Sequence, residues 1–220
     1  MYLSRLKLDV NNRRTMQALV SPNLFHGAVE SAFSGERKRN LWRIDTLHGE
    51  TYLMLLSEDK PDLSNVAEQF ALPEAQWETL PYEKLLDRIT VGGRWHFRLV
   101  ANPTVRRVKK DQEEMAHITP NRQTDRKIMA HITPNHQKEW LLNRAERFGF
   151  ELKEDEFQVT GSRWYRFRKK KDEKAYVSLL AVTFEGVLTV KDAEMFKHTL
   201  CNGIGREKAF GMGLLTVVRA

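Results

Sequence analysis

Asn202-Gly-Ile-Gly-Arg-Glu-Lys-Ala-Phe-Gly-Met-Gly-Leu-Leu215 is a glycine-rich segment between a predicted helix and the last predicted strand. Its glycines, at positions 203, 205, 211 and 213, allow backbone amides to approach a bulky anion and permit positive φ angles. Arg206 and Lys208 add positive charge at the same place. The alternative is that Gly203 only caps the preceding helix and that Gly211 and Gly213 only open a strand.

Neither of two common nucleotide-binding loops accounts for this segment. The chain contains no G-x-x-x-x-G-K-[ST] sequence, and Lys208 stands where a dinucleotide-binding fingerprint requires its third glycine. We therefore expect the segment to contact a phosphate backbone rather than a nucleotide cofactor. The candidate contact residues are Gly203, Gly205, Arg206 and Lys208.

Outward from this segment, the second half of the chain alternates between helix and strand patterns. Ala193 to Asn202 leads into the segment as a helix, and Met212 to Val218 follows it as a strand. Gln137 to Phe148 has the pattern of an amphipathic helix. Strand patterns lie between the two helices, at residues 150–159, 164–170 and 176–190. This half predicts a domain over residues 134–220 with an antiparallel sheet and helices on one face.

The first half of the chain repeats this organisation. A helix is expected to begin at Ser21-Pro22 and to run to about Phe33, and a short helix covers Leu63 to Phe70. Strand patterns occur at residues 2–10, 41–47, 51–57 and 94–101. The order β-α-β-β-α-β is the ferredoxin-like arrangement. We therefore predict an α+β fold of two tandem ferredoxin-like (RRM-like) domains, the first over residues 1–103.

The segment between the two predicted domains, residues 104–133, is polar and rich in charge. It contains Met115-Ala-His-Ile-Thr-Pro-Asn121, which recurs as Met129-Ala-His-Ile-Thr-Pro-Asn135. A single repeat is too short for a solenoid. We interpret it as a local duplication in an exposed linker, where an insertion costs little.

Charge points to a polyanionic partner. The 220 residues include 36 Lys and Arg against 29 Asp and Glu, a formal net charge of +7, and the pI is near 9.5. Nucleic acid is the leading candidate, ahead of an anionic membrane surface. The single cysteine, Cys201, excludes an internal disulfide, and we recognise neither a signal peptide nor a membrane-spanning run. We expect a soluble cytoplasmic protein.

A second basic segment runs from Arg163 to Lys171 and resembles one arm of a hairpin. It carries six cations in nine residues: Arg163, Arg166, Arg168, Lys169, Lys170 and Lys171. Strand alternation would place Arg166, Arg168 and Lys170 on one face and Tyr165 and Phe167 on the other. Such a ribbon suits a groove of duplex nucleic acid. A solvated edge strand protected by charge is the alternative.

Few residues suggest catalysis. The chain has no H-E-x-x-H, no G-x-S-x-G and no carboxylate cluster with metal-ligand spacing, and Cys201 has no evident base. The histidines at 117, 131 and 136 lack partners at metal spacing. We therefore expect neither a metal nor a small-molecule cofactor, and what remains is acid–base chemistry by a histidine. His26, at the apolar boundary of the first predicted helix and near its N-terminal end, suits a phosphate best, although a core histidine is the alternative.

Several short motifs together resemble the CRISPR-associated endoribonucleases of type I-E systems, the CasE family of the RAMP superfamily. Beside His26, they are Met1-Tyr-Leu-Ser4, Phe97-Arg-Leu99, Ala101-Asn-Pro103, Phe184-Glu-Gly186 before Leu188, Gly203-Ile-Gly205 with Lys208, and Gly211-Met-Gly213-Leu-Leu215. The last motif, with Phe-Glu-Gly upstream at this distance, is highly specific as a set.

This resemblance implies a metal-independent ribonuclease for antiviral defence. Such an enzyme binds the hairpin of the CRISPR repeat transcript and cuts at its 3′ base, leaving a 5′-hydroxyl and a 2′,3′-cyclic phosphate. It then retains the guide RNA and becomes a subunit of the Cascade complex. His26 matches the family's catalytic histidine and residues 163–171 match its basic hairpin, while Arg37, Lys38 and Arg39 are expected to help hold the stem.

Two features depart from the family pattern. Some relatives have a tyrosine three residues before the histidine, where this chain has Asn23, and an amide cannot replace a phenol in proton transfer. The first copy of the duplicated heptapeptide resembles an insertion. The competing interpretation is a non-catalytic RNA-binding subunit of a ribonucleoprotein complex. The residues do not distinguish a general base from a general acid at His26.

Overall fold

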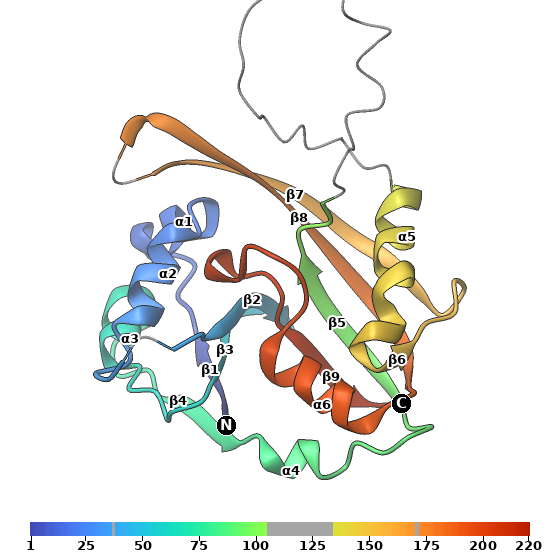
Figure 1. Cartoon of the computed structure of the whole chain (residues 1–220). Coiled ribbons are helices and arrows are strands. Elements are labelled where there is room, and N and C mark those ends of the chain that lie inside the picture. The colour runs from blue at the N-terminus through green and yellow to red at the C-terminus, as the bar shows by residue number, and fades with distance from the viewer. Residues whose placement is uncertain (37, 105–133, 170–171) are drawn as a thin grey trace, which may run out of the picture.

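The protein folds around two antiparallel sheets, which Figure 1 shows with the two ends of the chain on the same side. The structure is a computed structural model that describes residues 1–36, 38–104, 134–169 and 172–220. Arg37, Lys170 and Lys171 lie outside the described residues, as do the side chain of Lys169 and nearly all of the duplicated heptapeptide.

The first sheet has the strand order β2-β3-β1-β4, and every neighbouring pair is antiparallel. Its helices cover one face, where Phe25 and Val29 pack with Leu6, Leu53 and other buried side chains. The elements are β1 (Tyr2–Lys7), α1 (Arg13–Val20), α2 (Asn23–Glu30), β2 (Leu41–Leu47), β3 (Glu50–Ser57), α3 (Ser64–Phe70) and β4 (Trp77–Pro81).

The second sheet has the order β6-β8-β5-β9, and β7 also pairs with β8. Trp140 of α5 and Phe196 of α6 lie in one core cluster with Leu99, Phe184 and Leu188 of the sheet. The elements are α4 (Glu83–Leu86), β5 (Arg94–Ala101), α5 (Pro134–Ala145), η2 (Glu146–Phe148), β6 (Phe150–Glu151), β7 (Phe157–Lys169), β8 (Asp172–Val190), α6 (Ala193–Asn202), η3 (Lys208–Phe210) and β9 (Leu215–Arg219).

The tandem ferredoxin-like fold predicted from the sequence is confirmed, but one strand belongs to the other sheet. Arg94–Ala101 was expected to complete the first sheet, whereas Leu99 pairs with Phe184 of β8 and with Leu215 of β9. Trp77–Pro81 takes the edge position of the first sheet instead. The boundary predicted at residue 103 therefore falls one strand too late, and the segment 104–133 follows a strand of the second sheet. Alternation within a strand does not specify its partner, which explains the error.

The helix expected from Ser21 to Phe33 is also wrong in its extent. Within the expected range only α2 (Asn23–Glu30) forms, and it ends three residues before Phe33. Helix α1 precedes it and was not predicted, and Ser21 is the C-cap of α1 rather than the N-cap of the expected helix. Asn12 supplies the N-cap of α1, since its side chain accepts a hydrogen bond from the Arg14 amide. Inside α1, the buried Thr15 hydroxyl donates to the carbonyl of Phe70 over 3.0 Å. His26 consequently lies on the second helix of the chain.

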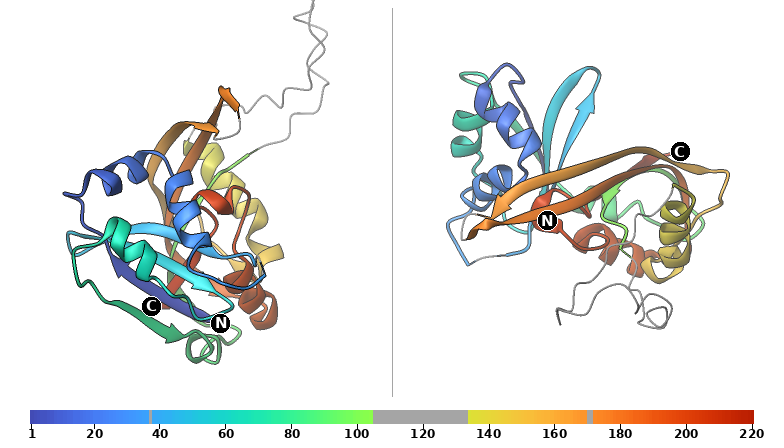
Figure 2. Two further views of the ribbon diagram at one scale, coloured as in Figure 1. Left: turned by 90° about the vertical axis from the view of Figure 1, so that its left-hand side faces the viewer. Right: turned by 90° about the horizontal axis from the view of Figure 1, so that it is seen from above.

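Strands β7 and β8 extend beyond the second sheet as a long two-stranded ribbon (residues 157–169 and 172–190). Figure 1 and the right-hand view of Figure 2 show this ribbon crossing over the helices of the first unit, and α1 contacts β7. The ribbon therefore brings the basic segment of the second unit above α1 and α2, the helices that precede and carry His26.

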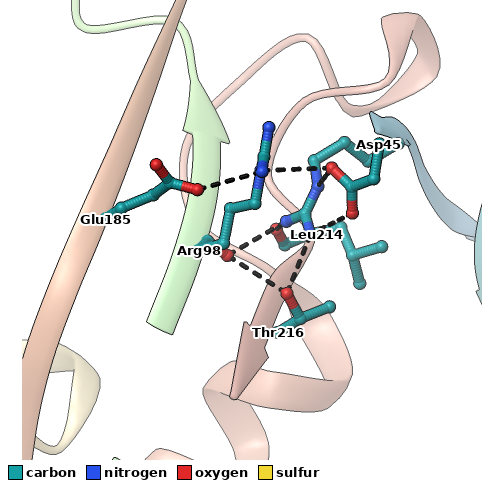
Figure 3. A network of polar contacts seen from close by, with 6 residues as sticks. Asp45, Arg98, Glu185, Leu214 and Thr216 are labelled. Atoms are coloured by element: carbon teal, nitrogen blue, oxygen red, sulfur yellow. Dashed lines mark hydrogen bonds and ion pairs between the residues drawn. The ribbon is translucent and has the colours of Figure 1, made fainter. Parts of the chain in front are cut away.

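A buried polar cluster joins the two sheets, as Figure 3 shows. Arg43 and Asp45 come from β2 of the first sheet and are 2% and 4% exposed. The Arg43 guanidinium donates to the carbonyls of Arg98 (3.0 Å) and Leu214 (2.8 Å) and to the hydroxyl of Thr216 (2.8 Å). Because these acceptors belong to β5, to β9 and to the residue before β9, the cluster fixes one sheet relative to the other.

Candidate functional site

His26 lies at the edge of the buried face of α2. Phe25, Ala28 and Val29 are the buried residues of this helix, whereas the His26 side chain is 25% exposed. The first turn holds the residue in place, because the amide of His26 donates to the carbonyl of Pro22 over 3.0 Å. The imidazole is therefore partly sheltered yet accessible, as its position in the sequence predicted.

Two side chains of different origin flank the imidazole. Nδ1 of His26 is 3.9 Å from Oε1 of Glu30, one turn further along α2. The ring centroid of Phe210, on η3, is 6.3 Å from the imidazole centroid at an interplanar angle of 60°. His26 thus lies where the first helical layer meets the glycine-rich segment of the second unit, and Figure 1 shows that segment as the red loop beneath the ribbon.

The glycine-rich segment (residues 202–215) forms a loop whose two ends are tied together. The Ile204 amide donates to the carbonyl of Gly213 over 2.8 Å, and the Gly213 amide donates to that of Val100 over 2.7 Å. Gly203 does cap α6, because its amide donates to Thr199, but its φ of 69° and close contact with Gly213 also require glycine. Gly203 therefore both caps α6 and allows the two ends of the glycine loop to approach each other.

The loop is also packed against the first sheet. A Cβ added to Gly211 would lie 2.8 Å from the Trp42 ring of β2, so only glycine allows this approach. Along the loop itself, the amides of Gly205, Arg206 and Glu207 donate to no acceptor among the described residues. Gly205 and Glu207 have positive φ angles of 85° and 61°. Consecutive unpaired amides in such a turn form a concave site for an anion.

Two of the predicted cations, Lys208 and Arg39, interact with each other electrostatically, whereas Lys38 pairs with carboxylates elsewhere. Burial lowers the pKa of Lys208 below its usual range, and the positive charge of Arg39 lowers it further. Lys208 and Arg39 therefore form a cationic pair next to the loop. Lys38 instead lies 2.9 Å from the Asp59 carboxylate and 3.3 Å from that of Glu58, and the hydrogen bond to Asp59 holds the pKa of Lys38 above its usual range.

The ribbon has the two faces that strand alternation predicted. Phe167 is 5% exposed and Tyr165 half-buried, while Arg166 and Arg168 are exposed. Tyr176 on β8 organises these arginines: its ring lies 4.7 Å from the Arg166 guanidinium and 5.3 Å from that of Arg168. Nε of Arg168 also donates to the Tyr176 hydroxyl over 3.0 Å. Arg163 stacks over Tyr165 at 4.9 Å.

The inner face of the ribbon contacts the loop. The rings of Phe167 and Phe210 are 5.1 Å apart at an angle of 55°, and Met212 packs with Phe167, Leu179 and other residues in the same small cluster. The structure therefore brings three segments together that are distant in the sequence: α2 with His26, the glycine loop and the basic ribbon.

Asn23, the departure from the family pattern, begins α2. Its side-chain oxygen is buried and has no hydrogen-bond partner in the described part of the chain. Across that same part, no group of three or more His, Cys, Asp or Glu side chains is arranged to hold a metal ion. No helix within the described ranges is both long and apolar enough to span a membrane.

Sequence reasoning missed three residues at this junction: Glu30, Phe210 and Tyr176. The spacing of four residues between Glu30 and His26 was a usable signal, because such pairs are neighbours on a helix. The contacts of Phe210 and Tyr176 had no such signal. Each depends on how a loop or a strand is placed by the tertiary fold.

The fold and the site define a tandem ferredoxin-like protein with a histidine, a glycine loop and a basic ribbon on one surface. A family model described as CRISPR associated protein matches residues 1–219, and the chain belongs to this family.

The chain is 31% identical over 230 residues to the CRISPR-associated endoribonuclease Cse3 of Thermus thermophilus, with 99% of each chain covered. A solved structure of Cse3 bound to a 19-nucleotide RNA matches with a TM-score of 0.74 at 29% identity, covering 99% of this chain and all of that one. Thermus thermophilus Cse3 bound to an RNA representing a pre-cleavage complex matches with the same TM-score at 28% identity, covering 99% of this chain and 98% of that one.

Proposed function

We propose that this protein is a metal-independent endoribonuclease that binds the hairpin of a CRISPR repeat transcript and cuts it at the 3′ base. The observation that carries this proposal is the junction of His26, the glycine loop and the basic ribbon on one surface. The name and RNA complexes of Cse3, a relative over the full length, support it.

The chemistry uses a nucleophile that RNA itself supplies. The 2′-oxygen attacks the adjacent phosphorus, so that an O2′–P bond forms and the P–O5′ bond breaks. The 2′-hydroxyl loses a proton and the departing 5′-oxygen gains one, which leaves a 2′,3′-cyclic phosphate and a 5′-hydroxyl. His26 carries out one of these two proton transfers. The reaction consumes no water and requires no metal.

The glycine loop would stabilise the charge that develops on the phosphate. The amides of Gly205, Arg206 and Glu207 form hydrogen bonds with no described acceptor and are therefore available to non-bridging oxygens. Lys208 adds a partly desolvated cation. Donors that are already oriented and sheltered from water stabilise a transition state more strongly than mobile ones do.

The ribbon would hold the RNA stem. Arg166 and Arg168 project from its outer face and lie over the Tyr176 ring. Arg163 lies over Tyr165, and Lys169, Lys170 and Lys171 continue the basic sequence. Phosphate contacts by such cations dominate affinity for duplex nucleic acid. After cleavage, the protein keeps the guide RNA and assembles with the other Cascade subunits.

One observation favours a second candidate, a non-catalytic RNA-binding subunit. Asn23 occupies the position at which some relatives have a tyrosine, and its amide oxygen is buried. An amide cannot transfer a proton at this position. In this second case the same surface would bind the hairpin without cutting it.

The deciding experiment uses the cognate repeat hairpin in excess EDTA, with the products resolved on a denaturing gel and their ends analysed. We expect one cut at the 3′ base with a cyclic phosphate. A matched hairpin with a single 2′-deoxy substitution before the scissile phosphate should bind equally well and stay intact. Tight binding without a cut of the all-RNA hairpin would favour the second candidate, and cleavage of the deoxy hairpin would contradict the 2′-hydroxyl mechanism.

A further inference from the structure

Two phenylalanine rings, Phe167 and Phe210, connect the basic ribbon to the imidazole of His26, the candidate catalytic residue. The ring of Phe167, on β7, lies 5.1 Å from that of Phe210, and Phe210 lies 6.3 Å from the imidazole of His26. Both contacts are tilted, at 55° and 60°, which is the geometry that aromatic pairs favour over a face-to-face stack. The series runs from the inner face of the ribbon through the loop to α2.

Phe210 is held firmly at the centre of this series. It ends the single turn η3, where its amide donates to the carbonyl of Glu207 over 2.9 Å. The next residue, Gly211, adopts a φ of 77° and lies directly against the Trp42 ring. The backbone on both sides of Phe210 is therefore restrained, which places its half-buried ring between Phe167 and His26.

Phe167 is similarly constrained on the ribbon side. It is 5% exposed and lies between Arg166 and Arg168, the exposed residues whose side chains project from the opposite face. Phe167 and the two arginines are consecutive residues of one strand, with side chains on opposite faces. A shift of β7 that brings the arginines onto RNA therefore also moves Phe167 relative to Phe210. A change in the position of the ribbon can thus reach the His26 imidazole through Phe167 and Phe210.

We propose that Phe210 is a positioning residue, which orients the His26 imidazole and makes this orientation depend on how the ribbon is seated. This inference rests on the proposed function. The His26 side chain, which is 25% exposed, can turn about two single bonds, and an aromatic ring packed against one side of the imidazole restricts this rotation. Reactions of this kind are sensitive to misplacement of the reacting groups by about 1 Å, which can cost on the order of 100-fold in rate.

The test compares Phe210→Leu with Phe210→Tyr. Leucine conserves the apolar contact and most of the volume, so the loop should stay folded, whereas tyrosine restores the ring. We expect Phe210→Leu to lower the single-turnover rate at saturating hairpin by about 10- to 100-fold with an unchanged Kd and Tm, and Phe210→Tyr to restore most of the rate. A wild-type rate in Phe210→Leu, or a loss that follows Kd or Tm, overturns the proposal.

A second measurement is independent of cleavage. The ring protons of His26 should shift in the NMR spectrum when Phe210 is replaced by leucine, and also when Phe167, which is one ring further away, is replaced by leucine. Phe148→Leu is the matched control, because Phe148 is a half-buried phenylalanine on η2 of the second unit. Unchanged His26 signals in Phe167→Leu would refute the coupling.

These outcomes separate the inference from the proposed function. If the wild-type protein cuts and His26→Ala does not, while Phe210→Leu cuts normally, only the inference fails. If the wild-type protein binds the hairpin tightly without cutting it, the proposed function fails, and the NMR comparison still decides whether Phe210 and Phe167 act on the imidazole.

Discussion

Arg43 and Asp45, two residues apart on β2, form a bidentate ion pair that lies almost wholly inside the protein. Nε and Nη2 of Arg43 donate to the two carboxylate oxygens over 2.7 and 2.6 Å. Arg98 of β5 approaches the same carboxylate at 3.2 Å and reaches Glu185 of β8 at 2.9 Å. The ion pair therefore belongs to the contact between the two sheets, on which the junction of His26 with the loop depends.

Removing Arg43 should destabilise the protein strongly. Arg43→Ala leaves the buried Asp45 with only the more distant Arg98 at 3.2 Å and removes a donor from the carbonyls of Arg98 and Leu214. Breaking a buried ion pair costs up to about 3–5 kcal/mol. Urea unfolding at neutral pH measures the free energy. Arg5→Ala is the control, since Arg5 forms an exposed pair with Glu78 at 2.9 Å and such pairs contribute about 1 kcal/mol or less. Equal losses in the two variants would show that the buried cluster has no special role.

Glu207 is expected to oppose both folding of the loop and RNA binding. It has a φ of 61°, a conformation that costs a non-glycine residue about 1 kcal/mol, and it puts a carboxylate into the loop with the unpaired amides. Glu207→Gly should therefore raise stability by about 0.5–1 kcal/mol and tighten hairpin binding.

The matched control for this prediction is Glu74→Gly, because Glu74 also has a φ of 61° but lies outside the candidate site, in the turn before β4. This variant should gain stability without a change in affinity. If both variants bind RNA equally well, the carboxylate of Glu207 does not act at the phosphate site.

The ribbon arginines should determine how strongly binding depends on salt. Each phosphate contact that is lost reduces the slope of log K against log salt by about 0.7–0.9. We expect Arg166→Ala and Arg168→Ala each to lower this slope by roughly one contact. Arg88 is an exposed residue just after α4, and Figure 1 shows α4 on the opposite side of the protein from the ribbon. Arg88→Ala should therefore leave the slope unchanged. A slope that stays constant in the ribbon variants would place the RNA elsewhere.

Lys208 should make stability depend on alkaline pH. Burial and Arg39 lower its pKa in the folded protein below the usual 10.5, so the folded state releases this proton before the unfolded state does. Stability therefore rises with pH between the lowered pKa and 10.5. Below this pH range, Lys208→Met should be more stable than wild type, because it removes a desolvated charge. Within the range the wild-type lysine loses its charge, so the difference in the free energy of unfolding should decrease.

Unfolding in urea from pH 8 upward measures this difference for Lys208→Met, with the exposed Lys84→Met as the control. Arg39→Met should move the window to higher pH, because it removes the second cause of the lowered pKa. A difference that is the same at every pH would contradict the placement of Lys208 as a desolvated cation.

Sequence patterns were sufficient for the fold class and for most individual elements. Alternation of Tyr165 and Phe167 with Arg166 and Arg168 predicted the two faces of the ribbon, because strand geometry is local. The sheet that β5 joins was not predictable in this way, since Arg94–Ala101 has the same alternation whichever partner it pairs with. Helix α1 was missed because it has only eight residues, of which Thr15 and Ala18 are buried, and two turns give few positions from which a helical period can be recognised.

In the candidate site too, local sequence patterns identify individual residues but not the contacts between distant segments. His26, Gly203 and Lys208 are recognisable from residue type and local pattern. The contact of Phe210 with His26, and the pairing of Lys208 with Arg39, depend on how the second unit packs against the first. No property of a short segment encodes such contacts, and they became visible only in the folded chain.

The measurement that tests the central claim most directly compares wild type with His26→Ala in two assays on one hairpin RNA. The assays are the equilibrium Kd and the single-turnover cleavage rate, both in EDTA. If His26 carries out a proton transfer at the junction, the variant binds as wild type does and its rate falls by about 100-fold or more. A cleavage rate equal to that of wild type at saturating RNA would contradict the account, and so would a loss of cleavage that only follows a loss of binding.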